Sequence, residues 1–169
     1  MNFPFLPRLM VNSLTDLTPA LLQEKGIRLL MLDFDNTIVP YTTNVPTEEM
    51  EQWLKMMLAS DITLCVVSNS KRDRVKIFCE KYGMDCITHS KKPFPKGIRQ
   101  CLKKYGICPC QCALAGDQIY ADVLGANGCR VYSILVKAIH NHTIWLKLRH
   151  VCELPFIGIA RLCGRTRQA

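Results

Sequence analysis

Two aspartates two positions apart, Asp33 and Asp35, follow directly on the apolar run of residues 29–32. Such a run is typical of a buried β-strand, in which side chains at positions i and i+2 point to the same face. In an open α/β sheet, ligands bind at the carboxyl ends of the strands. Two carboxylates crowded at that edge repel each other unless a cation or a reacting group needs them. The pair therefore indicates nucleophilic or metal-assisted chemistry, and the alternative is that both side chains only cap a turn.

Polar residues follow a second apolar segment in the same way. Ser68 and Asn69 come after residues 62–67 and directly before a predicted helix at residues 71–82. Hydroxyl and amide groups at a helix N-terminus suit a phosphate group, because the backbone N–H groups there lack partners. The alternative is an ordinary helix cap.

A basic loop and a second pair of aspartates complete the candidate residues. Lys91, Lys92 and Lys96 lie in a loop with two prolines after the third predicted strand. A lysine there could offset the charge of a nucleophile and its substrate, and the alternative is a solvated basic loop. Asp117 follows the fourth predicted strand, while Asp122 lies on the next helix, where it could also be ordinary helix polarity.

Alternating strands and helices must position these residues. The pattern of apolar runs and turn residues predicts strands at residues 27–32, 62–67, 85–89, 112–115 and 129–136, with helices at 19–25, 47–59, 71–82 and 98–105 and one that carries Asp122. This alternation is typical of an α/β fold with a doubly wound parallel sheet.

The run Asp33-Phe34-Asp35-Asn36-Thr37 resembles the DxDxT signature of the haloacid dehalogenase (HAD) phosphatases. The resemblance implies a Rossmann-like HAD core, with Asp33 as the nucleophile and Asp35 as the general acid and base. It further implies that Ser68, with Asn69 beside it, and Lys92 bind the phosphoryl group, and Lys91 and Lys96 are alternatives for the lysine.

The same resemblance implies a magnesium ion. Residues 116–122, with the pattern GDxxxxD, are similar to the fourth HAD motif. Asp117 would then bind Mg²⁺ together with Asp33 and the backbone carbonyl of Asp35. Asp122 would bind the ion directly or orient the groups that do.

Short connections distinguish this chain from HAD phosphatases with a cap domain. The 32 residues between Asp35 and Ser68 and the 23 between Ser68 and Lys92 are filled by the predicted loops, helices and strands. We therefore expect a capless, open site, which suits a bulky substrate. Together with the motif sequences, this makes the chain similar to the YqeG-like proteins of HAD subfamily IIIA, a branch that includes mitochondrial phosphatidylglycerophosphate phosphatases.

Charge and composition add expectations about partners. The chain has a net charge of +8, which favours anionic partners such as a phosphorylated small molecule, a nucleic acid or an anionic membrane. We predict two regions, a core at residues 1–137 and a basic, amphipathic C-terminal helical segment at 138–169. The segment is expected either to lie on an anionic membrane surface or to pack on the core.

The ten cysteines fall mostly where small apolar residues would fit, which favours a reducing compartment. No run approaches the roughly 20 apolar residues of a membrane span. We therefore expect a protein peripheral to a membrane in the cytoplasm, a plastid or the mitochondrial matrix.

The preferred hypothesis is Mg²⁺-dependent hydrolysis of phosphatidylglycerophosphate to phosphatidylglycerol through an aspartyl-phosphate. One alternative is a phosphatase that acts on a sugar phosphate, a nucleotide or a polynucleotide end. A second is a noncatalytic nucleic-acid-binding protein, which is disfavoured because the motifs are complete and aromatic residues are few.

Overall fold

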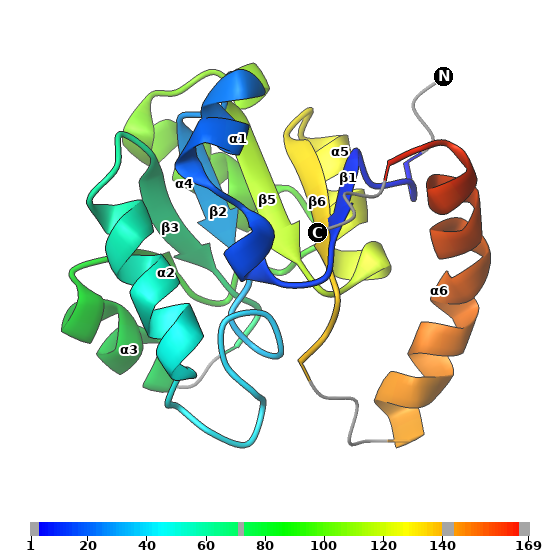
Figure 1. Ribbon diagram of the computed structural model, residues 1–169, viewed down its shortest axis with the longest axis horizontal. Helices are drawn as coiled ribbons and strands as arrows, with labels where there is room; N and C mark the ends of the chain where they lie inside the picture. Colours follow the sequence, from blue (N-terminus) through cyan, green and yellow to red (C-terminus); the bar gives the residue numbers. More distant parts are fainter. Residues whose placement is uncertain (1–3, 71–72, 140–143, 166–169) are drawn as a thin grey trace.

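The computed structural model describes residues 4–70, 73–139 and 144–165, and for residues 144–152 it describes the backbone alone. Six parallel strands form one sheet in the order β1-β6-β5-β2-β3-β4 (Figure 1). Their bounds are Leu9–Val11 (β1), Leu29–Leu32 (β2), Thr63–Val67 (β3), Asp85–Ile87 (β4), Cys112–Gly116 (β5) and Tyr132–Val136 (β6). The predicted doubly wound parallel sheet is confirmed.

Helices cover both faces of the sheet, which explains why its central strands are apolar throughout. On one face lie the 3₁₀ turn η1 (Leu14–Asp16) and helices α1 (Pro19–Glu24), α2 (Glu48–Leu58) and α3 (Arg74–Tyr82). On the other lie α4 (Lys96–Tyr105), the π-helical turn η3 (Ile119–Val123), α5 (Leu124–Gly128) and α6 (Ile144–Leu162). A 3₁₀ turn, η2 (Pro109–Gln111), precedes β5. Every residue of β2 and β5 is buried, so the ends of these two neighbouring strands are firmly placed.

Local sequence signals fix several of the helix boundaries. Thr18 caps α1 by accepting a hydrogen bond from the backbone N–H of Leu21, and Pro19 occupies the first helical position. Thr47 caps α2 in the same way. The apolar residues Met50, Trp53, Leu54 and Met57 of α2 are buried, whereas Leu58, the last residue of the helix, is 39% exposed.

Strand β1 was not among the predicted strands. Leu9–Val11 pairs with β6 at the edge of the sheet, so that β6 and β5 lie between it and β2. A strand of three residues is too short to show a hydrophobic period, so only its partner reveals it.

Helix α3 begins later than predicted. The described helix starts at Arg74, not at residue 71, and Asp73 precedes it without a side-chain capping bond. Residues 71 and 72 lie outside the described part of the chain. Ser68 and Asn69 therefore belong to a loop after β3, and not to the first turn of α3.

The C-terminal segment includes α6, whose described side chains contact the core on one side. Ala160 is buried among Leu6, Met10, Ile119 and Val123. The Arg165 guanidinium donates a hydrogen bond to the backbone oxygen of Pro7, 3.0 Å away. No helix in the described residues is both long and apolar enough to cross a bilayer.

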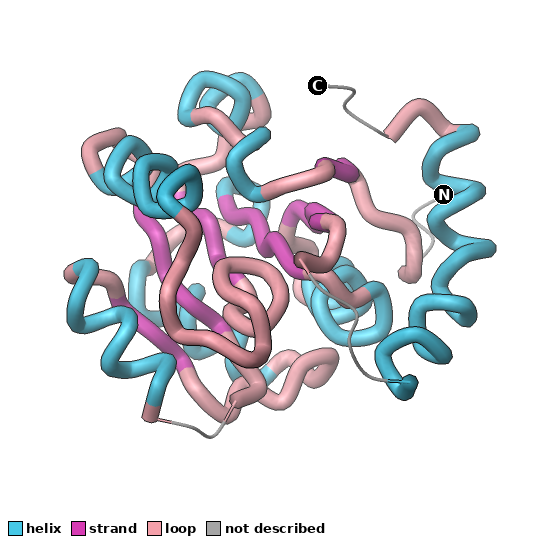
Figure 2. The backbone as a smooth tube through the Cα atoms, turned by 60° about the horizontal axis from the view of Figure 1, so that its bottom comes forward, coloured by secondary structure: helices cyan, strands magenta, loops and turns pink. Residues whose placement is uncertain are grey.

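The connections that leave the carboxyl ends of the strands are short. A loop and α2 join β2 to β3. A loop and α3 join β3 to β4, and residues 71 and 72 of this connection are not described. Figure 2 turns this edge of the sheet toward the reader, with its loops in front of the strands. The site at this edge has no covering domain within the described residues.

Candidate active site

Four of the predicted residues, Asp33, Ser68, Lys92 and Asp117, follow β2, β3, β4 and β5 at the same edge of the sheet. All four are buried, with exposed fractions of 8% or less. Strand β2 is paired with both β3 and β5, so their ends lie side by side. The sheet therefore collects side chains that are distant in sequence into one cluster.

Lys92 lies at the centre of this cluster. Its Nζ atom is 2.6 Å from Oδ1 of Asp33 and 2.7 Å from Oδ1 of Asp122. Lys91 and Lys96, the two alternatives for the motif lysine, have exposed side chains. The geometry therefore favours Lys92 as the lysine of the site.

The loop that carries Lys92 is held by Asn69. The side-chain oxygen of Asn69 accepts hydrogen bonds from the Ser90 hydroxyl and the Lys92 backbone N–H, both at 2.7 Å. Its amide nitrogen donates to the Lys92 backbone oxygen at 2.9 Å. These bonds give Asn69 a role in positioning Lys92, and its predicted contact with phosphate stays a prediction.

Ser68 is the remaining predicted phosphate-binding residue. Its hydroxyl oxygen accepts a hydrogen bond from the backbone N–H of Ser70 at 3.1 Å. That acceptor role leaves the hydroxyl hydrogen to donate elsewhere. The side chain lies directly after β3 and beside the loop of Lys92, because the Ser90 N–H donates to the Ser68 backbone oxygen.

Three carboxylates form a compact acidic group. One oxygen each of Asp33, Asp117 and Asp122 lies within 4.8 Å of the others, and all three residues are buried. Gly116 makes this approach feasible, since a Cβ atom at that position would overlap the carboxyl group of Asp122. Oδ2 of Asp122 also accepts a hydrogen bond from the Gln118 backbone N–H, 3.1 Å away.

The charge of this group fits a divalent cation. Three carboxylates against the single ammonium group of Lys92 leave two negative charges in a buried space. Carboxylate oxygens are the ligands preferred by small, hard divalent cations. Asp33 and Asp117 are the ligands that this geometry favours, and both Asp122 oxygens already contact other groups of the chain.

Burial dominates the electrostatics of Asp33, the predicted nucleophile. It raises the pKa of Asp33 to about 6 from an ordinary 3.8, with Lys92 opposing the rise and Asp122 adding to it. Burial alone would lower the pKa of Lys92, but Asp122 and Asp33 more than offset this and hold that pKa above its usual 10.5. The lysine is therefore charged at neutral pH, while Asp33 can exchange a proton for a cation.

Asp35, the predicted acid and base, is held by an arginine that sequence reasoning missed. The Arg74 Nη2 atom is 2.6 Å from Oδ1 of Asp35, and Nη1 donates to the Tyr41 backbone oxygen at 2.8 Å. The guanidinium also lies over the Phe34 ring, 5.1 Å from its centroid. Nothing in the sequence marks Arg74, because its partners are 33 and 39 residues away.

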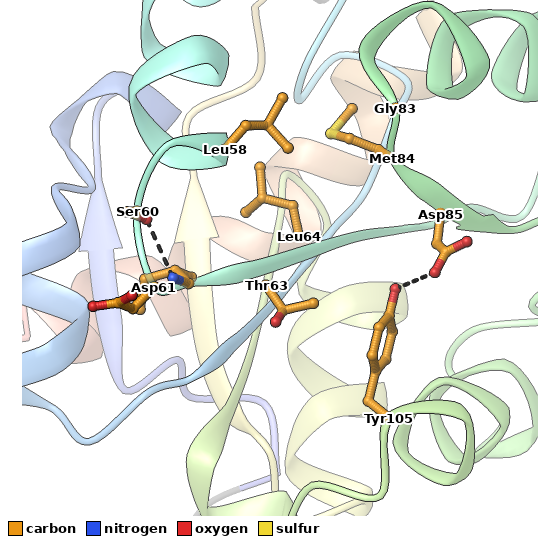
Figure 3. A pocket seen from close by; sticks show the side chains of 10 residues that line it. Leu58, Ser60, Asp61, Thr63, Leu64, Gly83, Met84, Asp85 and Tyr105 are labelled. Carbon is orange, nitrogen blue, oxygen red and sulfur yellow. Dashed lines mark hydrogen bonds between the residues drawn. The ribbon is translucent and has the colours of Figure 1, made fainter.

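Another hollow lies at the opposite edge of the sheet (Figure 3). It has a volume of about 520 Å³ and is lined by residues at the amino ends of β3 and β4, among them Leu64, Met84 and Asp85. The Tyr105 hydroxyl donates to Asp85 at its rim, 2.6 Å away. None of the residues predicted to do chemistry lines this hollow.

Solved structures support the class of fold. The cobalt-bound deoxy-D-mannose-octulosonate 8-phosphate phosphatase YrbI from Haemophilus influenzae superposes with a TM-score of 0.53 at 15% identity, over 80% of this chain and 92% of that one. A HAD superfamily hydrolase of subfamily III A from Legionella pneumophila gives 0.52 at 15% identity, over 83% and 90%. At such identities the likeness concerns the fold alone. The chain has the fold of these hydrolases, and the acidic cluster at its strand ends is an arrangement that the DxDxT resemblance predicts.

The sequence comparisons identify the family. The family model described as "Mitochondrial PGP phosphatase" matches residues 3–139. The chain is also 32% identical over 132 residues to "Probable phosphatase YqeG" of Bacillus subtilis (strain 168), which covers 78% of this chain and 77% of that protein. The chain belongs to the mitochondrial PGP phosphatase family, and the predicted resemblance to the YqeG-like branch is confirmed.

The first prediction concerns Arg74. Arg74→Ala should lower kcat/KM for p-nitrophenyl phosphate by about 10- to 100-fold, because Asp35 loses the group that orients it. Combined with Asp35→Asn, it should add little further loss, since both changes remove the same function. Lys76→Ala, on the exposed side of the same helix, is the matched control. Losses that multiply in the double variant would show that Arg74 does not act through Asp35.

The second prediction concerns cation binding and pH. The pKa of Asp33 is raised above its value in the unfolded chain, so this carboxyl lowers the stability of the cation-free fold as the pH rises through about 6. A cation present at ten times its Kd should restore about 1.4 kcal/mol, or roughly 3–6 °C in Tm.

Thermal unfolding with MgCl₂ or EDTA measures this effect. The increase in Tm should be large at pH 7.5 and smaller at pH 5, where protons compete for Asp33. An equal increase at both pH values would contradict the competition.

Proposed function

We propose that the protein is a Mg²⁺-dependent phosphomonoesterase that dephosphorylates phosphatidylglycerophosphate to phosphatidylglycerol through an aspartyl-phosphate. The observation that carries the proposal is the position of Asp33. It lies at a strand end, 2.6 Å from a buried ammonium group and within 4.8 Å of two further acids. The family description supports the substrate.

In the first half of the reaction, a carboxylate oxygen of Asp33 attacks phosphorus. A bond forms between Asp33 and the phosphoryl group, and the bond to the leaving oxygen breaks. Asp35 gives its proton to that leaving oxygen. Lys92 and the Ser68 hydroxyl hold the phosphoryl oxygens and balance the charge that develops on them.

In the second half, Asp35 takes a proton from water, which attacks the same phosphorus atom. The bond between phosphorus and Asp33 breaks, so inorganic phosphate leaves and the carboxylate is restored. Arg74 keeps the Asp35 carboxylate in place through the cycle. The residues that would hold Mg²⁺ are Asp33, Asp117 and the backbone carbonyl of Asp35, and the bound ion would supply neutralising charge.

The shape of the edge supports a large substrate. The connection after β2 consists of a loop and α2, and the described part of the connection after β3 consists of a loop and α3. Within the described residues, no inserted domain therefore covers Asp33. The terminal phosphate of a lipid headgroup could therefore reach the site while its acyl chains stay in the bilayer. A water-soluble phosphate ester would meet the same open site.

We also propose that the protein works at an anionic membrane surface on the matrix side of the mitochondrion, with a plastid or the cytoplasm as the alternative locations. The family description supports the mitochondrial location. In α6, Leu154, Ile159 and Leu162 are exposed by 49%, 46% and 89%, and Arg161 is exposed beside them. An apolar face with basic neighbours is typical of helices that lie at a lipid interface.

The third prediction tests the reaction and its substrate. Wild type should release phosphate from phosphatidylglycerophosphate in liposomes when Mg²⁺ is present and not with EDTA. Asp33→Asn should lose this release by at least about 1,000-fold, because no nucleophile remains, while its circular dichroism spectrum stays native.

Two outcomes of the same assay would change the proposal. Release from p-nitrophenyl phosphate without release from the lipid would keep the chemistry and refute the substrate. Substantial release by Asp33→Asn would refute the nucleophile.

The fourth prediction tests the membrane role of α6. Deleting the segment would also remove the buried residues Glu153 and Ala160, so substitutions of exposed side chains are the better test. The triple change Leu154→Ser, Ile159→Ser and Leu162→Ser should reduce flotation with phosphatidylglycerol vesicles about tenfold, since exposed apolar area is lost. Ser replacement of the exposed Met56 and Ile77 is the control. Unchanged flotation would refute this role of α6.

A further inference from the structure

The loop at residues 90–96, which ends at Lys96, the first residue of α4, has two sides with different chemistry. Lys92 points inward to Asp33 and Asp122, while Phe94, two residues on, is 69% exposed. Lys91 and Lys96 are also exposed. The loop therefore presents an exposed aromatic ring with an exposed lysine on each side of it in the sequence, two residues from Lys92 of the acidic cluster.

Hydrogen bonds and close packing hold this loop in one arrangement. Asn69 makes three hydrogen bonds to Ser90 and Lys92, and the Phe94 N–H donates to the Lys91 backbone oxygen at 2.8 Å. Gly97 lies so close to Ser90 that an added Cβ atom would overlap it. A loop anchored in this way holds the Phe94 ring in water, although burying an aromatic side chain is favourable.

The charges around Phe94 are not neutralised by the protein. Among the described residues, no ion pair involves Lys91 or Lys96. On the α2 side of the same edge the charge is different, because Glu48, Glu49 and Asp73 are exposed there. Among the described residues, exposed lysines therefore flank Phe94 in the sequence, whereas exposed acids mark the α2 side of this edge.

A lipid surface matches this combination better than a general anion would. Aromatic side chains insert at the boundary between headgroups and acyl chains, and each lysine near an anionic leaflet strengthens binding roughly fivefold. A second aromatic residue lies near Asp35, since the Tyr41 side chain is half exposed and its ring lies 5.8 Å from the Arg74 guanidinium. A nucleic acid would also use the lysines, but it offers no apolar layer into which the Phe94 ring could insert.

We propose that the loop at residues 90–96 docks on an anionic lipid bilayer, with Phe94 inserted and with Lys91 and Lys96 on the headgroups. Docking by this loop brings the catalytic edge to the membrane, because Lys92 of the same loop contacts Asp33. The inference rests on the proposed lipid substrate and adds the surface through which that substrate is reached. It is separate from the exposed face of α6.

The test compares one enzyme on two substrates. Phe94→Ser should lower the rate on phosphatidylglycerophosphate in vesicles about tenfold, at vesicle concentrations below saturation, because docking is weakened. Its kcat/KM for water-soluble p-nitrophenyl phosphate should stay within about twofold of wild type, since Phe94 contacts none of the reacting groups. Phe94→Trp should retain the vesicle rate, and the exposed Met56→Ser on α2 is the matched control.

Equal vesicle rates for Phe94→Ser and wild type, or equal losses on both substrates, would overturn the proposal. A second measurement, flotation with substrate-free vesicles, decides the matter even if the lipid proves not to be the substrate. Wild type should float with phosphatidylglycerol vesicles and much less with phosphatidylcholine vesicles, and Phe94→Ser and Lys91→Gln/Lys96→Gln should each float less. Flotation unaffected by these changes would refute docking, and salt-sensitive binding to RNA in place of vesicles would assign the loop to a nucleic acid.

Discussion

The site depends on the two ion pairs that the buried ammonium group of Lys92 makes. This group lies within 2.7 Å of both Asp33 and Asp122, two carboxylates that burial and mutual repulsion would otherwise keep apart or protonated. The contact also joins three segments that are distant in sequence: the end of β2, the loop at residues 90–96 and the turn η3. Removing Lys92 would therefore leave two buried carboxylates without their cation.

A second ion pair divides the work of the two aspartates after β2. Lys92 contacts Asp33, whereas Arg74 contacts Asp35. The two carboxylates are only two residues apart, yet each has its own cation from a different part of the chain. Asp33 can thus attack phosphorus while Asp35 donates and accepts protons, as the proposed mechanism requires.

Sequence reasoning located the site because the carboxyl ends of parallel strands meet at one edge. It placed Asp33, Ser68, Lys92 and Asp117 after the correct strands, and the structure brings them together. It could not find Arg74 or the role of the Asn69 amide, because both depend on partners more than 20 residues away. It also missed β1, whose three residues pair with a strand more than 100 residues later, so no local period could reveal it.

The central claim is that Asp33 carries the phosphoryl group during turnover. Trapping the intermediate tests it most directly: the enzyme is mixed with ³²P-labelled phosphatidylglycerophosphate vesicles and Mg²⁺, quenched in acid within the first turnover and digested. The account predicts a label that hydroxylamine removes and that maps to the peptide containing Asp33. A label on another residue would contradict this account. So would turnover of the substrate without labelled protein at any time point of the first turnover.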